Sequence, residues 1–277
     1  MDIRVALYEG PRSFSAAAGE FLRSRPVLHN LILTIVDRRL TESEAGKYWV
    51  AFRGDEVVGV ALQSPLTYPA TVVPMEPEVA AAVVDAIVDS GSSLPGVNGD
   101  VATAASFAGR WTERRRSAAV PTQGQRLYEL AELNEIAAVD GRLRKADARD
   151  RSLALRWLSA FDTEAHVQPR DVESFIDSAL LSSRVWLWEA GGAVVSMAIG
   201  SKAIEGVVRI SGVYTPKEER GCGYAQACVH GLSSLLTDAG YRCILYTDLG
   251  NPTSNSIYRR IGYRAVSEGI CYRFDEL

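Results

Sequence analysis

Residues 207–247 constrain the fold more than any other part of the chain. An apolar, β-rich run leads through Arg220-Gly221-Cys222-Gly223 into a segment where small and apolar residues recur at three- and four-residue spacing. This spacing predicts an amphipathic helix that ends at Gly240, and the run 241–247 is typical of a strand covered on both faces. The order strand, turn, helix, strand predicts a right-handed βαβ unit with two parallel strands.

The turn before this helix is suited to hold a phosphate group. Backbone N–H groups at a helix start lack intrahelical partners, and the helix dipole is positive there. Gly221 and Gly223 carry no Cβ that would keep an anion from the backbone. A dinucleotide fingerprint starting at Gly221 would need Gly or Ala where Gln226 stands, and the Gly-Lys-Ser/Thr of a nucleoside triphosphate loop is absent. The alternative is a Gly-rich helix entry without a ligand.

Two motifs resemble those of one known family. Arg220-x-x-Gly223-x-Ala225 resembles the acyl-CoA pyrophosphate motif of the GNAT superfamily of N-acetyltransferases. Residues 251–263 resemble the helix motif Asn-x-x-(small)-x-x-(Leu/Ile)-Tyr-x-x-x-Gly-(Phe/Tyr) of the same superfamily, at the expected distance downstream. The resemblance implies an α/β (α+β) fold, in which a mixed, mostly antiparallel sheet with a splayed parallel strand pair is flanked by helices. It also implies acetyl-CoA as co-substrate.

The resemblance places the acetyl-CoA site along this strand, turn and helix. Pantetheine is an amide chain, so it can pair with strand backbone where the parallel strands separate, and Arg220 can lie beside the diphosphate. Asn251, followed by Pro252, is predicted to be a helix N-cap in addition to a cofactor contact. The predicted cofactor-binding residues are Val213, Tyr214, Thr215, Arg220, Gly221, Cys222, Gly223, Tyr224, Ala225, Asn251 and Asn255.

Tyr258 is the predicted catalytic acid, because the resemblance places it at the thioester sulfur. Attack by an amine creates an oxyanion, for which a backbone N–H near Val213 is the expected donor, and expels a thiolate that needs a proton. Transfer from a phenol of pKa about 10 to a thiolate of pKa about 8.5 is slightly uphill, so a packing tyrosine is the alternative. The candidate general bases are Glu205 and Asp248, and for each the alternative, which the sequence favours, is a solvated turn residue.

An internal repeat divides the chain in two. Residues 49–61 match residues 186–198 without gaps at an offset of 137, and both segments are typical of β-hairpins with a Gly-containing turn. In the first copy the helix begins with Glu76 and Glu78 instead of the Arg-x-x-Gly-x-Ala turn, and these acidic residues disfavour a pyrophosphate. We therefore expect a degenerate GNAT-like domain over residues 1–138 and a catalytic, acetyl-CoA-binding GNAT domain over residues 139–277.

Composition excludes several other classes of protein. The 277 residues are 47% hydrophobic with a net charge of −4, and the basic clusters 114–116 and 142–145 are short, so neither nucleic acid nor membrane is an expected partner. Four cysteines without a Cys-x-x-Cys pair predict no metal site and no disulfide framework, which favours the cytoplasm. We find no signal peptide and no run of about 18 apolar residues.

Together these patterns predict an N-acetyltransferase that transfers an acetyl group from acetyl-CoA to a primary amine by direct attack in a ternary complex. The acceptor is a small-molecule amine or a peptide, and an oligomer is compatible with the sequence. Two alternatives are an acyl-CoA-binding sensor or scaffold without turnover and a thiol-biosynthetic acetyltransferase similar to mycothiol synthase. No pattern identifies the acceptor, the general base or the preferred acyl chain.

Overall fold

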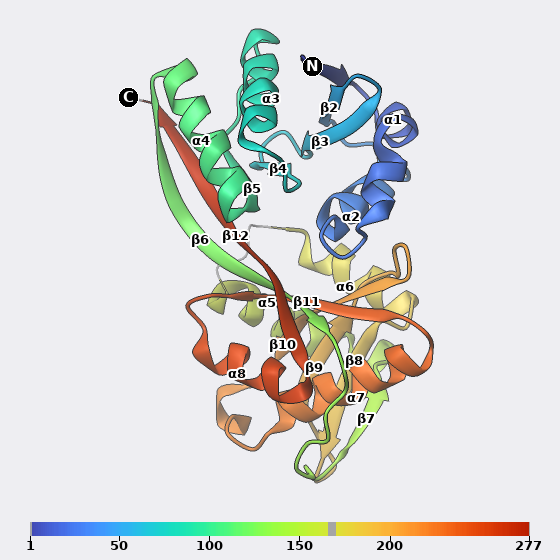
Figure 1. Cartoon of the computed structure of the whole chain (residues 1–277). Coiled ribbons are helices and arrows are strands. Elements are labelled where there is room, and N and C mark those ends of the chain that lie inside the picture. Colours follow the sequence, from blue (N-terminus) through green and yellow to red (C-terminus); the bar gives the residue numbers. More distant parts are fainter. Residues whose placement is uncertain (1, 166–169, 277) are drawn as a thin grey trace. The chain divides into compact units, whose positions relative to one another are not determined.

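A computed structural model describes residues 2–165 and 170–276, which form two compact units (Figure 1). Unit 1 comprises residues up to Arg126 together with those from Val266 onward, and unit 2 comprises Leu127–Ala265. The sequence placed a boundary after residue 138, in a polar stretch. By contacts between residues, the units divide inside two long strands, β6 (Ser117–Leu130) and β12 (Tyr263–Glu276), each of which contributes residues to both units.

In unit 1 a mixed sheet is covered by four helices. The strand order is β1-β2-β3-β4-β5-β12-β6, and β4 and β5 are parallel, with Ala70 opposite Val97. The strands other than β6 and β12 are β1 (Ile3–Tyr8), β2 (Lys47–Arg53), β3 (Glu56–Gln63), β4 (Ala70–Val72) and β5 (Gly96–Asp100). The helices are α1 (Pro11–Ser24), α2 (Asn30–Arg39), α3 (Pro77–Asp89) and α4 (Val101–Arg115).

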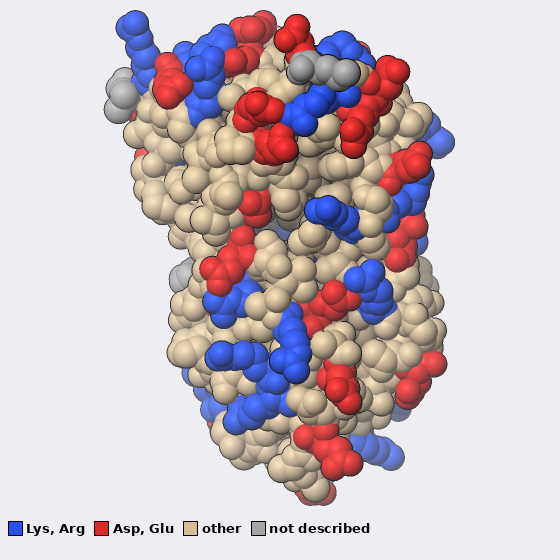
Figure 2. All heavy atoms as spheres, in the orientation of Figure 1, with Lys and Arg blue, Asp and Glu red and all other residues tan. Residues whose placement is uncertain are grey.

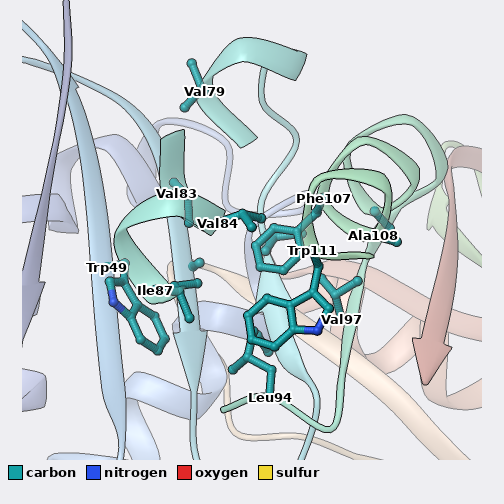
Figure 3. Close-up of a cluster of buried hydrophobic side chains, with 14 of the residues drawn as sticks. Trp49, Val79, Val83, Val84, Ile87, Leu94, Val97, Phe107, Ala108 and Trp111 are labelled. Carbon is teal, nitrogen blue, oxygen red and sulfur yellow. The ribbon is translucent and has the colours of Figure 1, made fainter. Parts of the chain in front are cut away.

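The core of unit 1 lies between α3, α4 and the sheet (Figure 3). Val79, Val83 and Ile87 recur at helical spacing on α3, so one apolar stripe of that helix is buried. Trp111 of α4 stacks on Phe274 of β12 with ring centroids 5.0 Å apart and planes inclined by 11°. The last strand of the chain thus belongs to the core of unit 1.

Unit 2 has the same kind of architecture, with strand order β12-β6-β11-β10-β9-β8-β7. The strands not yet bounded are β7 (Arg142–Lys145), β8 (Val185–Ala190), β9 (Ala193–Gly200), β10 (Val207–Tyr214) and β11 (Arg242–Asp248). The helices are α5 (Arg151–Glu164), α6 (Val172–Leu181), α7 (Tyr224–Asp238) and α8 (Pro252–Ile261), with 3₁₀ turns η1 (Ala148–Asp150) and η2 (Lys217–Glu219).

The two faces of the unit 2 sheet carry different helices. Successive residues of a strand point to opposite faces. On β9, Ala198 packs with Cys228 and Leu232 of α7, whereas Met197 and Ile199 pack with Leu158 of α5. The helices α7 and α8 therefore cover one face, and α5 and α6 cover the other.

The parallel strands β10 and β11 begin paired and then separate. Their register runs from Val207 opposite Arg242 to Ile210 opposite Leu245 and ends there. Next to this point the β9–β10 register shifts between Ser211 and Tyr214, where Gly212 has φ of 56°. This confirms the predicted mixed sheet with a splayed parallel pair.

The hairpins β2–β3 and β8–β9 confirm the repeat in detail. Trp49 lies opposite Ala61, and Trp186 lies opposite Ala198, at the same offset of 137 in both strands. The register shift also recurs at this offset, after Ala51 in one hairpin and after Trp188 in the other. A bulge kept at one place supports two copies of a single unit.

The short basic clusters lie in ion-pair networks. Arg114 bonds to Asp85 and Asp89 of α3, each at 2.6 Å, and Arg144 bonds to Asp150 at 2.7 Å and to Glu189 at 2.9 Å. Figure 2 shows basic and acidic side chains side by side on the visible face of the molecule.

Candidate active site

A pocket of about 640 Å³ lies in unit 2, where β10 has left β11. Its walls come from the end of β10, the turn that follows, the first turn of α7, the face of α8 that carries Tyr258, and the end of α5. The lining residues are Phe161, Glu164, Ala165, Val213, Tyr214, Thr215, Glu219, Arg220, Gly221, Gly223, Tyr224, Ala225, Gln226, Asn251, Thr253, Ser254, Ile257, Tyr258 and Arg260.

The turn into α7 has the backbone of an anion site. Gly221 and Gly223 have φ of 87° and 83°, a left-handed conformation that other residues seldom adopt. Gly223 is the N-cap and supplies no side chain to the first turn of the helix. The first intrahelical bond is donated by Ala227 N–H to Gly223 O at 3.0 Å, so the N–H groups of residues 224–226 precede it. These groups are free for a ligand at the positive end of the helix.

Arg220 is held at the pocket by two acceptors. Its Nε donates to Thr215 O at 2.9 Å, and its Nη2 donates to Glu164 Oε2 of α5 at 2.8 Å. The side chains of Arg220 and Glu164 are 44% and 40% exposed, and an ion pair this exposed is weak. An anionic ligand can therefore replace Glu164 as the partner of Arg220.

Tyr258 presents a neutral phenol to the pocket. Its ring packs among Tyr128 and Tyr263, with centroids 6.5 and 6.1 Å away. The residue is 8% exposed, and this burial raises the pKa of Tyr258 to about 12. Among the described residues its hydroxyl has no hydrogen-bond partner, so the phenol can donate to a ligand.

The two asparagines of the second motif have different positions. The side chain of Asn251 lines the pocket and caps α8 by accepting a bond from Ser254 N–H at 3.0 Å. Asn255 is 4% exposed and donates to Asp248 O at 3.0 Å and to Asn251 O at 2.7 Å. Its Oδ1 accepts a bond from the Tyr128 hydroxyl at 3.1 Å. Asn255 therefore fixes the start of α8 from behind the pocket.

The structure brings ten of the predicted site residues together. Those that line the pocket are Val213, Tyr214, Thr215, Arg220, Gly221, Gly223, Tyr224, Ala225, Asn251 and Tyr258. Cys222 is exposed and does not line it, because its side chain leaves the turn between two glycines that do. Asn255 does not line it either.

The two predicted general bases lie outside the pocket. Glu205 has φ of 49° in the turn before β10, whereas the pocket begins at Val213 near the other end of that strand, roughly 20 Å beyond Val207 at 3.3 Å per residue. Asp248 is exposed at the end of β11, and its Oδ1 accepts a bond from Gly250 N–H at 2.7 Å. Both residues lie in turns, the position that the sequence analysis gave as the alternative to a general base.

Sequence patterns missed the wall that α5 provides. Phe161, Glu164 and Ala165 precede Arg220 by more than 50 residues, and no local spacing connects them to it. The place of Ser254 in the pocket could have been predicted, because it lies four residues before Tyr258 on the same face of a helix. Ile257, next to Tyr258, also lines the pocket.

The corresponding place in unit 1 is built differently. The helix α3 begins with Glu76 as N-cap and Glu78 in its first turn, and Arg53 bonds to both carboxylates. The Arg53 guanidinium lowers the pKa of Glu76, so this carboxylate stays ionised. Met75 N–H donates to Thr103 Oγ1 of α4 at 3.0 Å, which ties the turn to that helix.

Among the described residues, no group of three or more His, Cys, Asp or Glu side chains is arranged to hold a metal ion. No helix in the described part of the chain has the length and apolar character needed to cross a membrane.

This chain is similar to one protein family over part of its length and to several solved structures over nearly all of it. The family described as FR47-like protein matches residues 194–272, and no curated protein matches the chain. A GNAT-family acetyltransferase from Colwellia psychrerythraea has a similar structure, with a TM-score of 0.65 at 10% identity over 99% of this chain and 100% of that one. A GCN5-related N-acetyltransferase from Sphaerobacter thermophilus has a TM-score of 0.67 at 15% identity, over 97% of this chain and 95% of that one. A tandem GNAT protein from the clavulanic acid biosynthesis pathway has a TM-score of 0.55 at 10% identity, over 99% of this chain and 98% of that one.

Proposed function

Because this chain carries the GNAT fold twice in tandem, we propose that unit 2 is an N-acetyltransferase that uses acetyl-CoA to acetylate a primary amine. One observation carries the proposal. The open glycine turn of α7, the free edge of β10 and the buried phenol of Tyr258 all line one pocket. Each of them matches a different part of acetyl-CoA, namely the diphosphate, the amide chain and the thioester.

In this proposal the diphosphate is bound mainly by backbone. The N–H groups of residues 224–226 would face its oxygens, and Arg220 would exchange the carboxylate of Glu164 for the diphosphate. Pantetheine would lie along β10 from Val213 to Thr215, where the pairing with β11 has ended. Asn251 would contribute from the start of α8, and no metal is required.

The reaction forms a C–N bond and breaks a C–S bond. The unprotonated amine attacks the acetyl carbon, and a backbone N–H near Val213 stabilises the oxyanion. The oxyanion then collapses, the CoA sulfur leaves as a thiolate, and the nitrogen loses one proton. Thiolate and proton together account for the free thiol that is released.

Tyr258 is proposed to donate its hydroxyl proton towards the leaving sulfur. A phenol of pKa about 12 is a weaker acid than a thiol of pKa about 8.5, so complete transfer is uphill by roughly 5 kcal/mol. We therefore assign Tyr258 first as a neutral donor that stabilises the thiolate by hydrogen bonding. Glu205 lies at the far end of β10, too distant to accept the amine proton, and Asp248 would have to accept it through bridging water.

Binding and turnover can be tested separately. We expect acetyl-CoA to raise the melting temperature of the protein, and a panel of amines to release free thiol from acetyl-CoA, detected with a thiol reagent. Stabilisation without thiol release from any amine would favour an acyl-CoA sensor. Absence of both would refute the proposal for unit 2.

We place the reaction in the cytoplasm, where thiols stay reduced.

A further inference from the structure

Arg209 lies on β10 just before the parallel strands separate. It is opposite Ile244, and the next pair, Ile210 with Leu245, is the last one. The side chain of Ile210 belongs to the core under α7, so the alternation of β-strands directs Arg209 to the other face, which α5 and α6 cover. Arg209 therefore faces away from α7, whose start provides the glycine turn.

The charge of Arg209 is not compensated within the described part of the chain. Its guanidinium makes no hydrogen bond or ion pair there, and its electrostatic neighbours are the phenol of Tyr246 and the guanidinium of Arg170. Arg170 is itself paired with Asp162, at 2.8 and 2.6 Å. Residues 166–169, which the structure does not describe, read His-Val-Gln-Pro and include no carboxylate.

A more deeply buried arginine, Arg39, has carboxylate partners, whereas the partly buried Arg184 donates to Gly200 O and to Ser178 Oγ, each at 3.3 Å. The side chain of Arg39 is 5% exposed and bonds to Glu44 at 2.7 Å and to Glu42 at 3.1 Å. Arg209 is partly buried, and loss of water lowers its pKa, yet no carboxylate among the described residues is paired with it. A partly buried guanidinium without a counter-ion is unfavourable for the fold, and an anion of a ligand would compensate its charge.

The location fits the second substrate. Tyr246 is the first residue of β11 beyond the last parallel pair, and two-residue spacing places it on the same face as Ile244 and Arg209. Val213, where the thioester is proposed to lie, is four residues from Arg209, or about 13 Å along the strand. Arg209 does not itself line the pocket, so an acceptor would have to extend from the thioester towards the guanidinium, and the long arginine side chain can cover part of this distance.

We propose that Arg209 binds an anionic group of the acceptor, so that unit 2 acetylates an amine that also carries a carboxylate or a phosphate. This inference rests on the proposed acetyltransferase function. The planar guanidinium can donate two parallel hydrogen bonds to either anion, which would orient the amine towards the acetyl carbon.

Matched pairs of amines test the assignment. The carboxylate arm compares amino acids with their amides, the phosphate arm compares aminoethyl phosphate with aminoethanol, and kcat/KM is measured by thiol release. The wild type should prefer the anionic member of at least one arm by about 10- to 100-fold, as expected for charge-assisted hydrogen bonds. Arg209→Gln should remove this preference, mainly through KM, and Arg209→Lys should keep part of it.

Two controls separate recognition from folding and from cofactor binding. Arg242→Gln changes an exposed arginine of β11 that pairs with Glu129, and it should leave the preference unchanged. The stabilisation of Arg209→Gln by acetyl-CoA should equal that of the wild type. If no amine is acetylated, the N-acetylated products of the same pairs are added to the protein together with CoA, and the melting temperature is measured. Only the anionic product of each pair should raise it.

The outcomes distinguish the two proposals. A protein that does not bind acetyl-CoA refutes the acetyltransferase function itself. A protein that binds acetyl-CoA but treats anionic and neutral members alike, in turnover or in product binding, overturns the role of Arg209 alone. A preference that survives in Arg209→Gln overturns it too.

Discussion

Gly223 is the residue on which diphosphate binding most depends. We expect Gly223→Glu to abolish the thermal stabilisation by acetyl-CoA, because it puts a charged side chain into the anion site. Its Cβ would also lie 3.2 Å from Val139 Cγ2, at a φ of 83° that disfavours any side chain. Gly192→Glu is a matched control, since Gly192 has φ of 81° in the β8–β9 turn with no atom within 4 Å. Stabilisation that persists in Gly223→Glu would contradict the site.

Tyr258→Phe isolates the hydroxyl group from the ring. The ring packing should be kept, and no hydrogen bond to a described residue is lost. We expect kcat to fall at least about tenfold while the Kd of acetyl-CoA, measured by calorimetry, stays the same. The exposed Tyr241→Phe serves as control. An unchanged kcat would remove Tyr258 from the proton-donor role.

The raised pKa of Tyr258 also predicts a pH dependence. Burial favours the neutral phenol and raises its pKa to about 12, so the phenol stays protonated as pH rises through about 10. Between about pH 8 and 10, the kcat of the wild type and the kcat of Tyr258→Phe should therefore change with pH in the same way. A decrease in this range that the variant abolishes would show that the phenol ionises earlier.

Glu164 competes with the ligand for Arg220. Glu164→Gln removes the carboxylate 2.8 Å from Arg220 Nη2, and we expect the Kd of acetyl-CoA to fall several-fold, as for removal of one weak exposed ion pair. Glu129→Gln breaks the ion pair with Arg242, a residue that does not line the pocket, and should leave the Kd unchanged. Weaker binding by Glu164→Gln would mean that Glu164 supports the bound state.

Residues with a local conformational role could be predicted from sequence. Gly223 enables a left-handed turn, and Asn251 caps a helix, and both roles are encoded by their immediate neighbours. The partners of Arg220 and Asn255 could not be predicted, since Glu164 and Tyr128 are 56 and 127 residues away in the chain. Only the tertiary fold brings these side chains together.

Among the secondary-structure elements, α8 joins stability to binding. Asn251→Ala removes the cap bond to Ser254 N–H and should lower the free energy of unfolding by about 1 kcal/mol, measured by denaturant titration. It should also weaken acetyl-CoA binding, because Asn251 lines the pocket. Asp100→Ala removes the equivalent cap of α4, a 3.1 Å bond to Thr103 N–H, and should cost similar stability without affecting binding. Equal acetyl-CoA affinities in the two variants would exclude a ligand contact by Asn251.

The hairpins and the helix α7 could be predicted from periodicity, but the longest strands could not. Residues 125–130 alone have the local pattern of a strand, whereas β6 begins at Ser117. Its first half contains Pro121 and Gly124 and lacks a clear alternation of apolar residues. The strand β12 was not predicted at all, and pairing with β5 from Gly269 to Arg273 overrides its weak local pattern.

For the molecule as a whole, β12 matters to both units. Deletion of residues 266–277 would expose the edge of β5 and remove Phe274 from Trp111, so we expect unit 1 to become sensitive to protease. Unit 2 contains the whole pocket and should keep its stabilisation by acetyl-CoA. Phe274→Ala should also make unit 1 more sensitive to protease, but less than the deletion does. A protease-resistant unit 1 in the deletion variant would contradict this division of the chain.

The route of the chain has a consequence for its biosynthesis. Unit 1 takes its first 126 residues from the beginning of the chain and a further strand from residue 266 onward. On a ribosome that adds about 5–20 residues per second, the earlier part must wait several seconds or more for that strand. During this interval the nascent polypeptide presents an unpaired β5 edge, the kind of surface that chaperones protect.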